Sequence, residues 1–312
     1  MSPAANRPAG SPHDGRRDGQ PRFERFVVVD WSANATPKRG KDSIWIGVHA
    51  ADGTRHEPLN VPTRIEAVDH LAALLRTPAR TLVGVDFPLG YPAGFAAAAG
   101  LIRPGQAPWE AVCSHLGAAI VDGSRNANNR WDVAAALNER LGSLHFWGAP
   151  PRRSGPHLSC RKPLPASVAA ATPPLEPFRH TEKRLRAGGR HPFSVWQLLG
   201  AGSVGSQALT GIAAVQRLRA HPAVADRLQL WPFETGFTSG TADIVVAEVW
   251  PSMVDFSTQP HPVKDAQQVA ALAEWFALRQ RHGTLEGLFA PQLPVEAQAA
   301  VRTEEGWVLG VE

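Results

Sequence analysis

The sequence predicts an α/β fold around a mixed β-sheet, and the main evidence is two apolar runs that each end on an aspartate. The first run covers residues 26–31 (FVVVDW) and the second covers residues 81–90 (TLVGVDFPLG). An apolar run of this length between turn residues indicates a buried strand. Because open α/β sheets bind ligands at the carboxyl ends of their strands, Asp30 and Asp86 are predicted to lie at a functional edge.

The segment between these two runs predicts two further strands and one helix. Residues 42–51 and 55–61 are expected to be strands that meet at Asp52-Gly53, a dipeptide typical of hairpin turns. Residues 64–76 carry apolar side chains at helical spacing. The order is therefore three meandering strands, a crossover helix and a fourth strand that returns beside the first, which is how the ribonuclease H-like fold begins.

Residues 91–192 are predicted to form an insertion in the sheet domain, because proline and glycine recur there and interrupt regular patterning. Helices are expected at 108–121 and 131–141. Two basic clusters in the insertion predict a surface that grips a substrate, and a solvated basic surface is the alternative. These clusters comprise Arg152, Arg153, Arg161 and Lys162 in a proline-rich loop, and Arg179, Lys183, Arg184, Arg186 and Arg190 around a short helix.

Regular structure is predicted again in the C-terminal third of the chain. The expected elements are a helix near 203–219, strands at 228–234 and 244–250, and a long helix at 263–281 with one apolar face. Residues 1–22 are rich in proline, glycine and arginine and are expected to be a disordered tail. We thus predict a single ribonuclease H-like domain over residues 23–312.

Composition limits the classes of function. The chain has 312 residues, 43% of them apolar, and a formal charge of +4, which permits a polyanionic partner without requiring one. Cys113 and Cys160 are the only cysteines, which excludes a disulfide framework and a four-cysteine metal site, so a reducing cytoplasm is expected. No run approaches the roughly 20 apolar residues that cross a bilayer, so no membrane partner is expected. Neither an HExxH nor a GxSxG motif is present.

Four acidic residues are the candidates for a catalytic metal centre. Asp30 and Asp86 end strands, Glu248 lies in an otherwise apolar strand, and Asp265 lies in the first turn of the last long helix. Crowded carboxylates repel one another unless cations are present, so Mg²⁺ or Mn²⁺ is the expected cofactor. Each acid also has a structural interpretation: Asp30 and Asp86 as turn residues, Asp265 as a helix-dipole partner, and Glu248 as a buried group that requires a partner.

Seven segments spread along the chain carry a family resemblance. They are VVVDWSAN (27–34), VGVDFPLGYP (83–92), SVWQLLGAGSVGSQALTGI (194–212), LWPFETG (230–236), AEVWPS (247–252), HPVKDAQQV (261–269) and EEGWVLG (304–310). In these segments the chain resembles the family known as domain of unknown function 429, whose members are described as predicted nucleases of ribonuclease H fold. The resemblance implies active-site roles for Asp30, Asp86, Glu248 and Asp265, and a phosphate contact for Lys264.

The glycine-rich segment 200–205 (GAGSVG) spells GxGxxG ahead of a predicted helix and has three interpretations. A dinucleotide site would pair it with Glu234, although Glu234 lies beyond the usual spacing of about twenty residues. Alternatively, the loop would bind a phosphate or a nucleic-acid backbone through Gly202 and Ser203. A plain turn that allows tight helix packing is the third interpretation.

The leading functional prediction is metal-dependent hydrolysis of a phosphodiester in DNA or RNA, which would make the protein a hydrolase. The four acids would hold Mg²⁺ or Mn²⁺, while Lys264, Arg179 and Lys183 would contact substrate phosphates. Trp31 would stack on a base, with core packing as its alternative. Other functions left open are nucleotide binding or phosphotransfer at the glycine loop, as in sugar-kinase-like ATPases, and binding without catalysis. The expected partner is nucleic acid or another phosphorylated substrate.

Overall fold

A mixed β-sheet with helices on both faces forms the centre of the computed structural model, which describes residues 22–164 and 174–312. The strands are β1 (Arg25–Asp30), β2 (Ile44–Ala50), β3 (Leu59–Val61), β4 (Thr81–Val85), β5 (Leu228–Leu230) and β6 (Ile244–Glu248). The α-helices are α1 (Arg64–Arg76), α2 (Phe95–Ala98), α3 (Pro108–Ala119), α4 (Arg130–Leu141), α6 (His180–Ala187), α7 (Gly205–Ala220), α8 (Lys264–Arg281) and α9 (Val295–Ala300). Short 3-10 turns lie at Pro151–Arg153, Pro251–Met253 and Glu286–Phe289, and a π-helical turn lies at Val301–Glu305.

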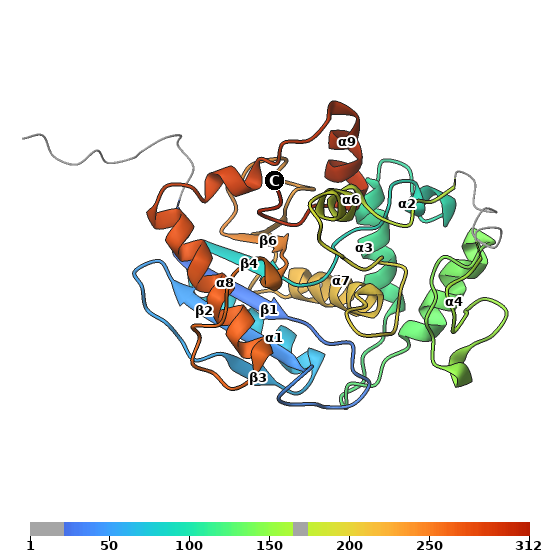
Figure 1. Cartoon of the computed structure of the whole chain (residues 1–312), viewed down its shortest axis with the longest axis horizontal. Helices are drawn as coiled ribbons and strands as arrows, with labels where there is room; N and C mark the ends of the chain where they lie inside the picture. Colours follow the sequence, from blue (N-terminus) through green and yellow to red (C-terminus); the bar gives the residue numbers. More distant parts are fainter. Residues whose placement is uncertain (1–21, 165–173) are drawn as a thin grey trace, which may run out of the picture.

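The strand order of the six-stranded sheet is β3-β2-β1-β4-β6-β5 (Figure 1). β1, β2 and β3 pair antiparallel as a meander, and β4 returns through α1 to lie parallel to β1. β6 and β5 extend the sheet in parallel beyond β4. The predicted antiparallel start and the parallel return of the fourth strand are therefore confirmed.

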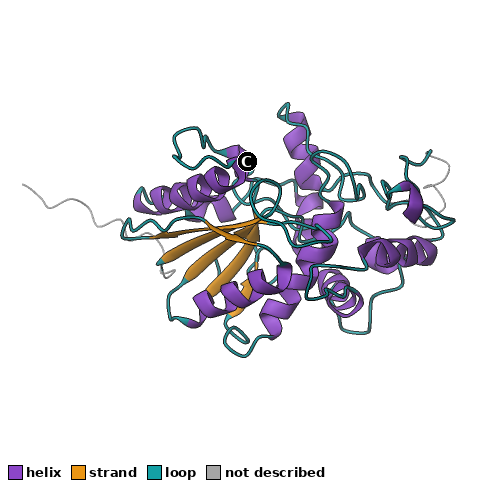
Figure 2. Ribbon diagram, turned by 90° about the horizontal axis from the view of Figure 1, so that it is seen from below, coloured by secondary structure: helices purple, strands orange, loops and turns teal. Residues whose placement is uncertain are grey.

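Helix α8 covers one face of the sheet, and helices α1 and α7 cover the other (Figure 2). Alternate residues of each buried strand face opposite layers, so each strand contributes to two hydrophobic clusters. Gly47 of β2 permits the close contact of α8, because a Cβ there would lie 2.6 Å from the carbonyl oxygen of Val269. This close packing fixes where α8 begins relative to the ends of the strands.

Several predicted elements have bounds that differ from those their apolar patterns suggest. The strand predicted at 228–234 ends at Leu230, because Pro232 has no backbone N–H and the chain turns through a Glu234 N–H bond to the Leu230 carbonyl, 2.9 Å long. The strand predicted at 244–250 ends at Glu248, shortly before Pro251 opens a 3-10 turn. The helix predicted near 203–219 begins at Gly205.

Residues 91–164 and 174–192, the described part of the predicted insertion, pack on the sheet through the same hydrophobic cluster as α1 and α7. Figures 1 and 2 show α3 and α4 to one side of the sheet. The helices predicted at 108–121 and 131–141 are observed as α3 and α4. The predicted disordered tail lies, apart from residue 22, outside the described residues. Among the described helices, none is long and apolar enough to span a membrane.

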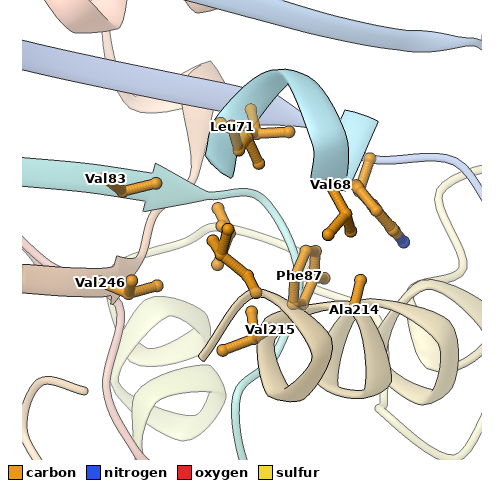
Figure 3. Close-up of a pocket in the computed structure, with 11 residues that line it drawn as sticks. Val68, Leu71, Val83, Phe87, Ala214, Val215 and Val246 are labelled. Atoms are coloured by element: carbon orange, nitrogen blue, oxygen red, sulfur yellow. The ribbon is translucent and has the colours of Figure 1, made fainter. Parts of the chain in front are cut away.

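An apolar cavity of about 20 Å³ lies between the sheet and helices α1 and α7 (Figure 3). Val83 and Val246 face it from the sheet, Val68 and Leu71 from α1, and Val215 from α7. The space matches roughly one water molecule, but its lining offers no polar partner. The cavity is therefore a small packing defect in the core.

Adding one methyl group to this cavity is expected to stabilise the protein. Val215→Ile should raise the free energy of unfolding by about 0.5–1 kcal/mol, because one further CH₂ becomes buried in existing space. The midpoint of urea unfolding measures the change. Val295→Ile is the matched control, because Val295 is 82% exposed and gains nothing from the same methyl group. A lower midpoint for Val215→Ile would show overpacking and contradict the prediction.

Candidate metal centre at the ends of strands β1 and β4

The pairing register of β1 and β4 brings Asp30 and Asp86 together. Val29 pairs with Val85, and the Asp86 N–H donates to the Val29 carbonyl at 3.1 Å. Asp30 and Asp86, the next residues, therefore lie side by side at the ends of the two strands. Both lie one residue beyond valines that face α1 and α7, and therefore both point toward the α8 face. Their partly buried carboxyl groups share a hydrogen bond.

Asp265 is the third carboxylate of the cluster and comes from the first turn of α8. Its Oδ2 accepts a 2.7 Å hydrogen bond from the N–H of Asp42, which lies in the loop after β1. Asp42 has a left-handed backbone with φ of 55°, a conformation that aspartate tolerates better than most residues. The loop after β1 and the start of α8 are thereby joined beside Asp30 and Asp86.

Burial and mutual repulsion disturb the titration of this cluster. Burial raises the pKa of Asp86 to about 7, against the opposing effect of a hydrogen bond from the Trp31 N–H. Burial, followed by the nearby charges of Asp86 and Asp265, raises the pKa of Asp30 well above its ordinary value. The Asp30–Asp86 pair therefore holds a shared proton near neutral pH unless another cation replaces it.

Trp31 is a core residue, so the predicted role of stacking on a base does not fit its position. Its side chain is 3% exposed, and its indole N–H donates to Thr210 Oγ1 of α7 at 3.2 Å. Its backbone N–H donates to Asp86 Oδ1 at 2.7 Å. Trp31 thus orients Asp86 from the backbone while its ring packs beneath the strand ends.

Glu248 does not join the three aspartates. β6 pairs with β4 so that Glu248 lies opposite Val85, which places Glu248 one residue out of step with Asp86 and on the opposite face of the sheet. There it is buried and accepts two hydrogen bonds from Arg179, at 2.7 Å from Nη1 and 2.6 Å from Nη2. The interpretation of Glu248 as a buried group with a partner is the one that its position supports.

Two of the predicted phosphate contacts also lie away from the aspartate cluster. Arg179 is fully buried and bridges Glu248 to Glu182, so its guanidinium has no surface to offer a substrate. Lys183 lies on α6 and pairs with Glu176 at 3.3 Å. Lys264, in contrast, is exposed in the first turn of α8 next to Asp265.

Sequence reasoning missed the loop between β1 and β2. This loop contains Lys38, Lys41 and Asp42, and Asp42 contributes a fourth negative charge near Asp30. Within the described residues, neither Lys41 nor Lys264 has a carboxylate partner. Lys41 directly precedes Asp42 and Lys264 directly precedes Asp265, the two residues that are hydrogen-bonded to each other. The basic run PKRGKD, directly after the strand that delivers Asp30, is the signal that could have identified the loop.

The glycine-rich segment 200–205 is a loop that leads into α7. Gly202 has φ of +78°, and Ser203 Oγ donates to the Gly200 carbonyl at 2.8 Å. The residues before the loop form turns rather than a strand, so the strand-loop-helix arrangement of a dinucleotide site is not observed here. The interpretations as a phosphate loop and as a plain turn both fit the observed backbone.

The oxygen ligands at the strand ends suit a hard divalent cation. Across residues 22–164 and 174–312, no three His, Cys, Asp or Glu side chains form a group that could hold a metal ion by themselves. Mg²⁺, however, commonly takes one or two protein carboxylates and completes its shell with water and substrate phosphate. The Asp30–Asp86 pair meets that requirement, and a cation there would offset the burial and the carboxylate repulsion that together raise the pKa values.

The comparisons add no family assignment to this geometry. Neither the protein-family models, the curated proteins nor the solved structures give a match to the chain. What the structure establishes is an α/β protein with a mixed six-stranded sheet flanked by helices and three aspartates gathered at the ends of its central strands.

Proposed function

We propose that this protein is a metal-dependent nuclease of ribonuclease H-like fold that hydrolyses phosphodiester bonds in DNA or RNA. The observation that carries the proposal is the Asp30–Asp86 carboxyl pair, which the β1–β4 register brings together, partly buried and close to Asp265. The antiparallel meander followed by a parallel fourth strand supports the fold assignment, as does the resemblance to the domain of unknown function 429 family.

Each residue of the cluster has a separate role in the proposed reaction. Asp30 and Asp86 would hold Mg²⁺ or Mn²⁺, and Asp265 would add negative charge from the start of α8. When bound, the metal would supply a Lewis acid and an activated water. The backbone N–H groups of Trp31 and Asp42 hold Asp86 and Asp265 in fixed orientations before the substrate arrives.

The charge around the cluster favours a phosphorylated substrate. Lys41 and Lys264 are the sequence neighbours of Asp42 and Asp265 and form no ion pair among the described residues, and the Lys264 ammonium lies over the Phe256 ring at 5.6 Å. Both lysines would contact phosphate oxygens of the substrate. Carboxylates alone would repel a nucleic-acid strand, and the two lysines together with the cation would offset that repulsion. We therefore place the scissile phosphate between the Asp30–Asp86 pair and the loop after β1.

The direct test is cleavage of end-labelled DNA and RNA by purified protein in Mn²⁺ or Mg²⁺. Wild-type protein should nick at least one of these substrates only when metal is present. Asp30→Asn should lower the rate by several orders of magnitude, because one of the two metal-holding carboxylates is lost. Asp69→Asn, which removes an exposed carboxylate from α1, is the matched control and should cleave like wild type.

Two outcomes would contradict the proposal in different ways. Cleavage that survives Asp30→Asn would place the active site elsewhere. A wild-type protein that binds nucleic acid without cleaving it in either metal would favour the alternative of a binding protein that lacks catalysis.

A further inference from the structure

The first turn of helix α7 lacks a side-chain cap and lies beside the proposed metal centre. Its N-cap residue, Val204, provides no side-chain cap. The Gly205 N–H donates to the Gln197 carbonyl at 2.9 Å, whereas the N–H groups of Ser206 and Gln207 find no acceptor among the described residues. Gln207 Nε2 donates to the Trp31 carbonyl at 2.7 Å, and the Trp31 N–H contacts Asp86. One residue therefore connects this helix end to the Asp30–Asp86 pair.

Arg130 directs a buried guanidinium to the same helix end. It is 8% exposed, and its Nε donates to Ser206 Oγ at 3.0 Å while Nη1 donates to Asn128 Oδ1 at 2.8 Å. Both acceptors are neutral, and the guanidinium also lies over the Trp131 ring, with Cζ 4.2 Å from the ring centroid. Its Nη2 makes no hydrogen bond with the described residues and is not among the fully enclosed polar atoms, so it still faces solvent. The positive charge of Arg130 thus has no counter-ion of its own.

The described residues around Arg130 also provide no free carboxylate to balance its charge. Asp122 is the nearby carboxylate, and it is already paired with both Arg64 and Arg217. Burial, followed by repulsion from Arg64 and Arg153, lowers the pKa of Arg130 to about 10. The guanidinium therefore remains charged at neutral pH. A buried cation is costly without an anion, and three guanidinium groups here share one carboxylate.

We propose that Arg130 and the first turn of α7 bind a phosphate oxyanion. The free N–H groups of a helix N-terminus offer aligned donors to an anion, and a guanidinium adds donors in a planar fork that suits phosphate. In the proposed nuclease, on which this part of the inference rests, the bound group is a second phosphate of the strand, near the one at the metal centre. The glycine loop 200–205 is then the backbone turn that opens α7 toward this anion.

Binding of inorganic phosphate to metal-free protein tests the site without reference to catalysis. In EDTA, added phosphate should raise the melting temperature of wild type and of Asp30→Asn by the same amount. Arg130→Gln should lose most of that rise, because a hydrogen bond to a charged group typically accounts for about tenfold or more in affinity. Arg76→Gln, an exposed substitution on α1 with the same charge change, should retain it and so accounts for the general salting effect of phosphate.

A second variant leaves Arg130 in place. Val204→Asp puts a carboxylate at the helix N-terminus, where it should occupy the anion position, remove the response to phosphate and keep the protein folded. If wild type and both variants respond equally to phosphate, the site does not exist.

Cleavage kinetics then identify the source of the phosphate. If the anion belongs to the substrate strand, Arg130→Gln should raise KM for nucleic acid about tenfold or more while kcat changes little. An unchanged KM beside a lost phosphate response would overturn the assignment to the strand and leave free phosphate as the ligand. If phosphate binds and no nucleic acid is cleaved, the nuclease proposal fails while the anion site stands.

Discussion

Replacing Arg179 with methionine is expected to lower the free energy of unfolding by about 3–5 kcal/mol. Arg179 is fully buried and joins three parts of the chain: Glu182 on α6, Glu248 at the end of β6, and the carbonyl of Glu305 near the C-terminus at 2.8 Å. Methionine fills a similar volume but leaves two buried carboxylates without a cation. The loss therefore comes mainly from unpaired charge rather than from an empty cavity.

Equilibrium unfolding in urea measures this loss against a matched arginine. Arg153→Met removes the same group from a solvent-exposed pair, in which Arg153 is 49% exposed and lies 3.5 Å from Asp132. That pair should contribute less than about 1 kcal/mol. If Arg179→Met also costs less than this, the network does not hold the fold together. Glu248→Gln should still allow Mn²⁺-dependent cleavage, because Glu248 and the three aspartates lie on opposite faces of the sheet.

The position of Glu248 shows what the sequence could not reveal about the site. VVVD, VGVD and VVAE all read as buried strands that end on an acid, so a sequence reader aligns the three acids. The pairing aligns Val29 with Val85 and Val85 with Glu248 instead. A shift of one residue reverses the face of a strand side chain, and nothing within a short apolar run fixes the register against a neighbouring strand.

The parts that sequence reasoning located correctly depend on local patterns. Helix 64–76 was predicted from its apolar spacing, and its bounds are observed as Arg64–Arg76 with Thr63 as a hydrogen-bonded N-cap. The meander was predicted from the turn signals between its strands. The contact of Asp42 with Asp265 joins residues 223 positions apart, and such long-range contacts have no local signature.

Asp86→Asn is expected to make the metal-free protein more stable at pH 8 by about 2–4 kcal/mol. The Asp86 pKa of about 7 in the folded protein exceeds the unfolded value of about 3.9. Between these values the folded state holds a proton that the unfolded state has lost, so the free energy of unfolding falls as pH rises from about 4 to about 7. Asparagine removes this penalty and can still accept the hydrogen bond from the Trp31 N–H.

The difference between the wild-type and Asp86→Asn stability curves isolates the Asp30–Asp86 pair, because buried acids outside this pair titrate in both proteins. Urea unfolding from pH 4 to pH 8 should show the two curves diverging as pH rises, while exposed Asp69→Asn follows wild type. Mg²⁺ at pH 8 should stabilise wild type and leave Asp86→Asn nearly unchanged, because the cation replaces the shared proton. If the stability of the two proteins changes in parallel with pH, or if Mg²⁺ stabilises both equally, a bound cation does not act by relieving repulsion within the aspartate cluster. The instability of the empty cluster and its proposed affinity for metal would then have separate causes.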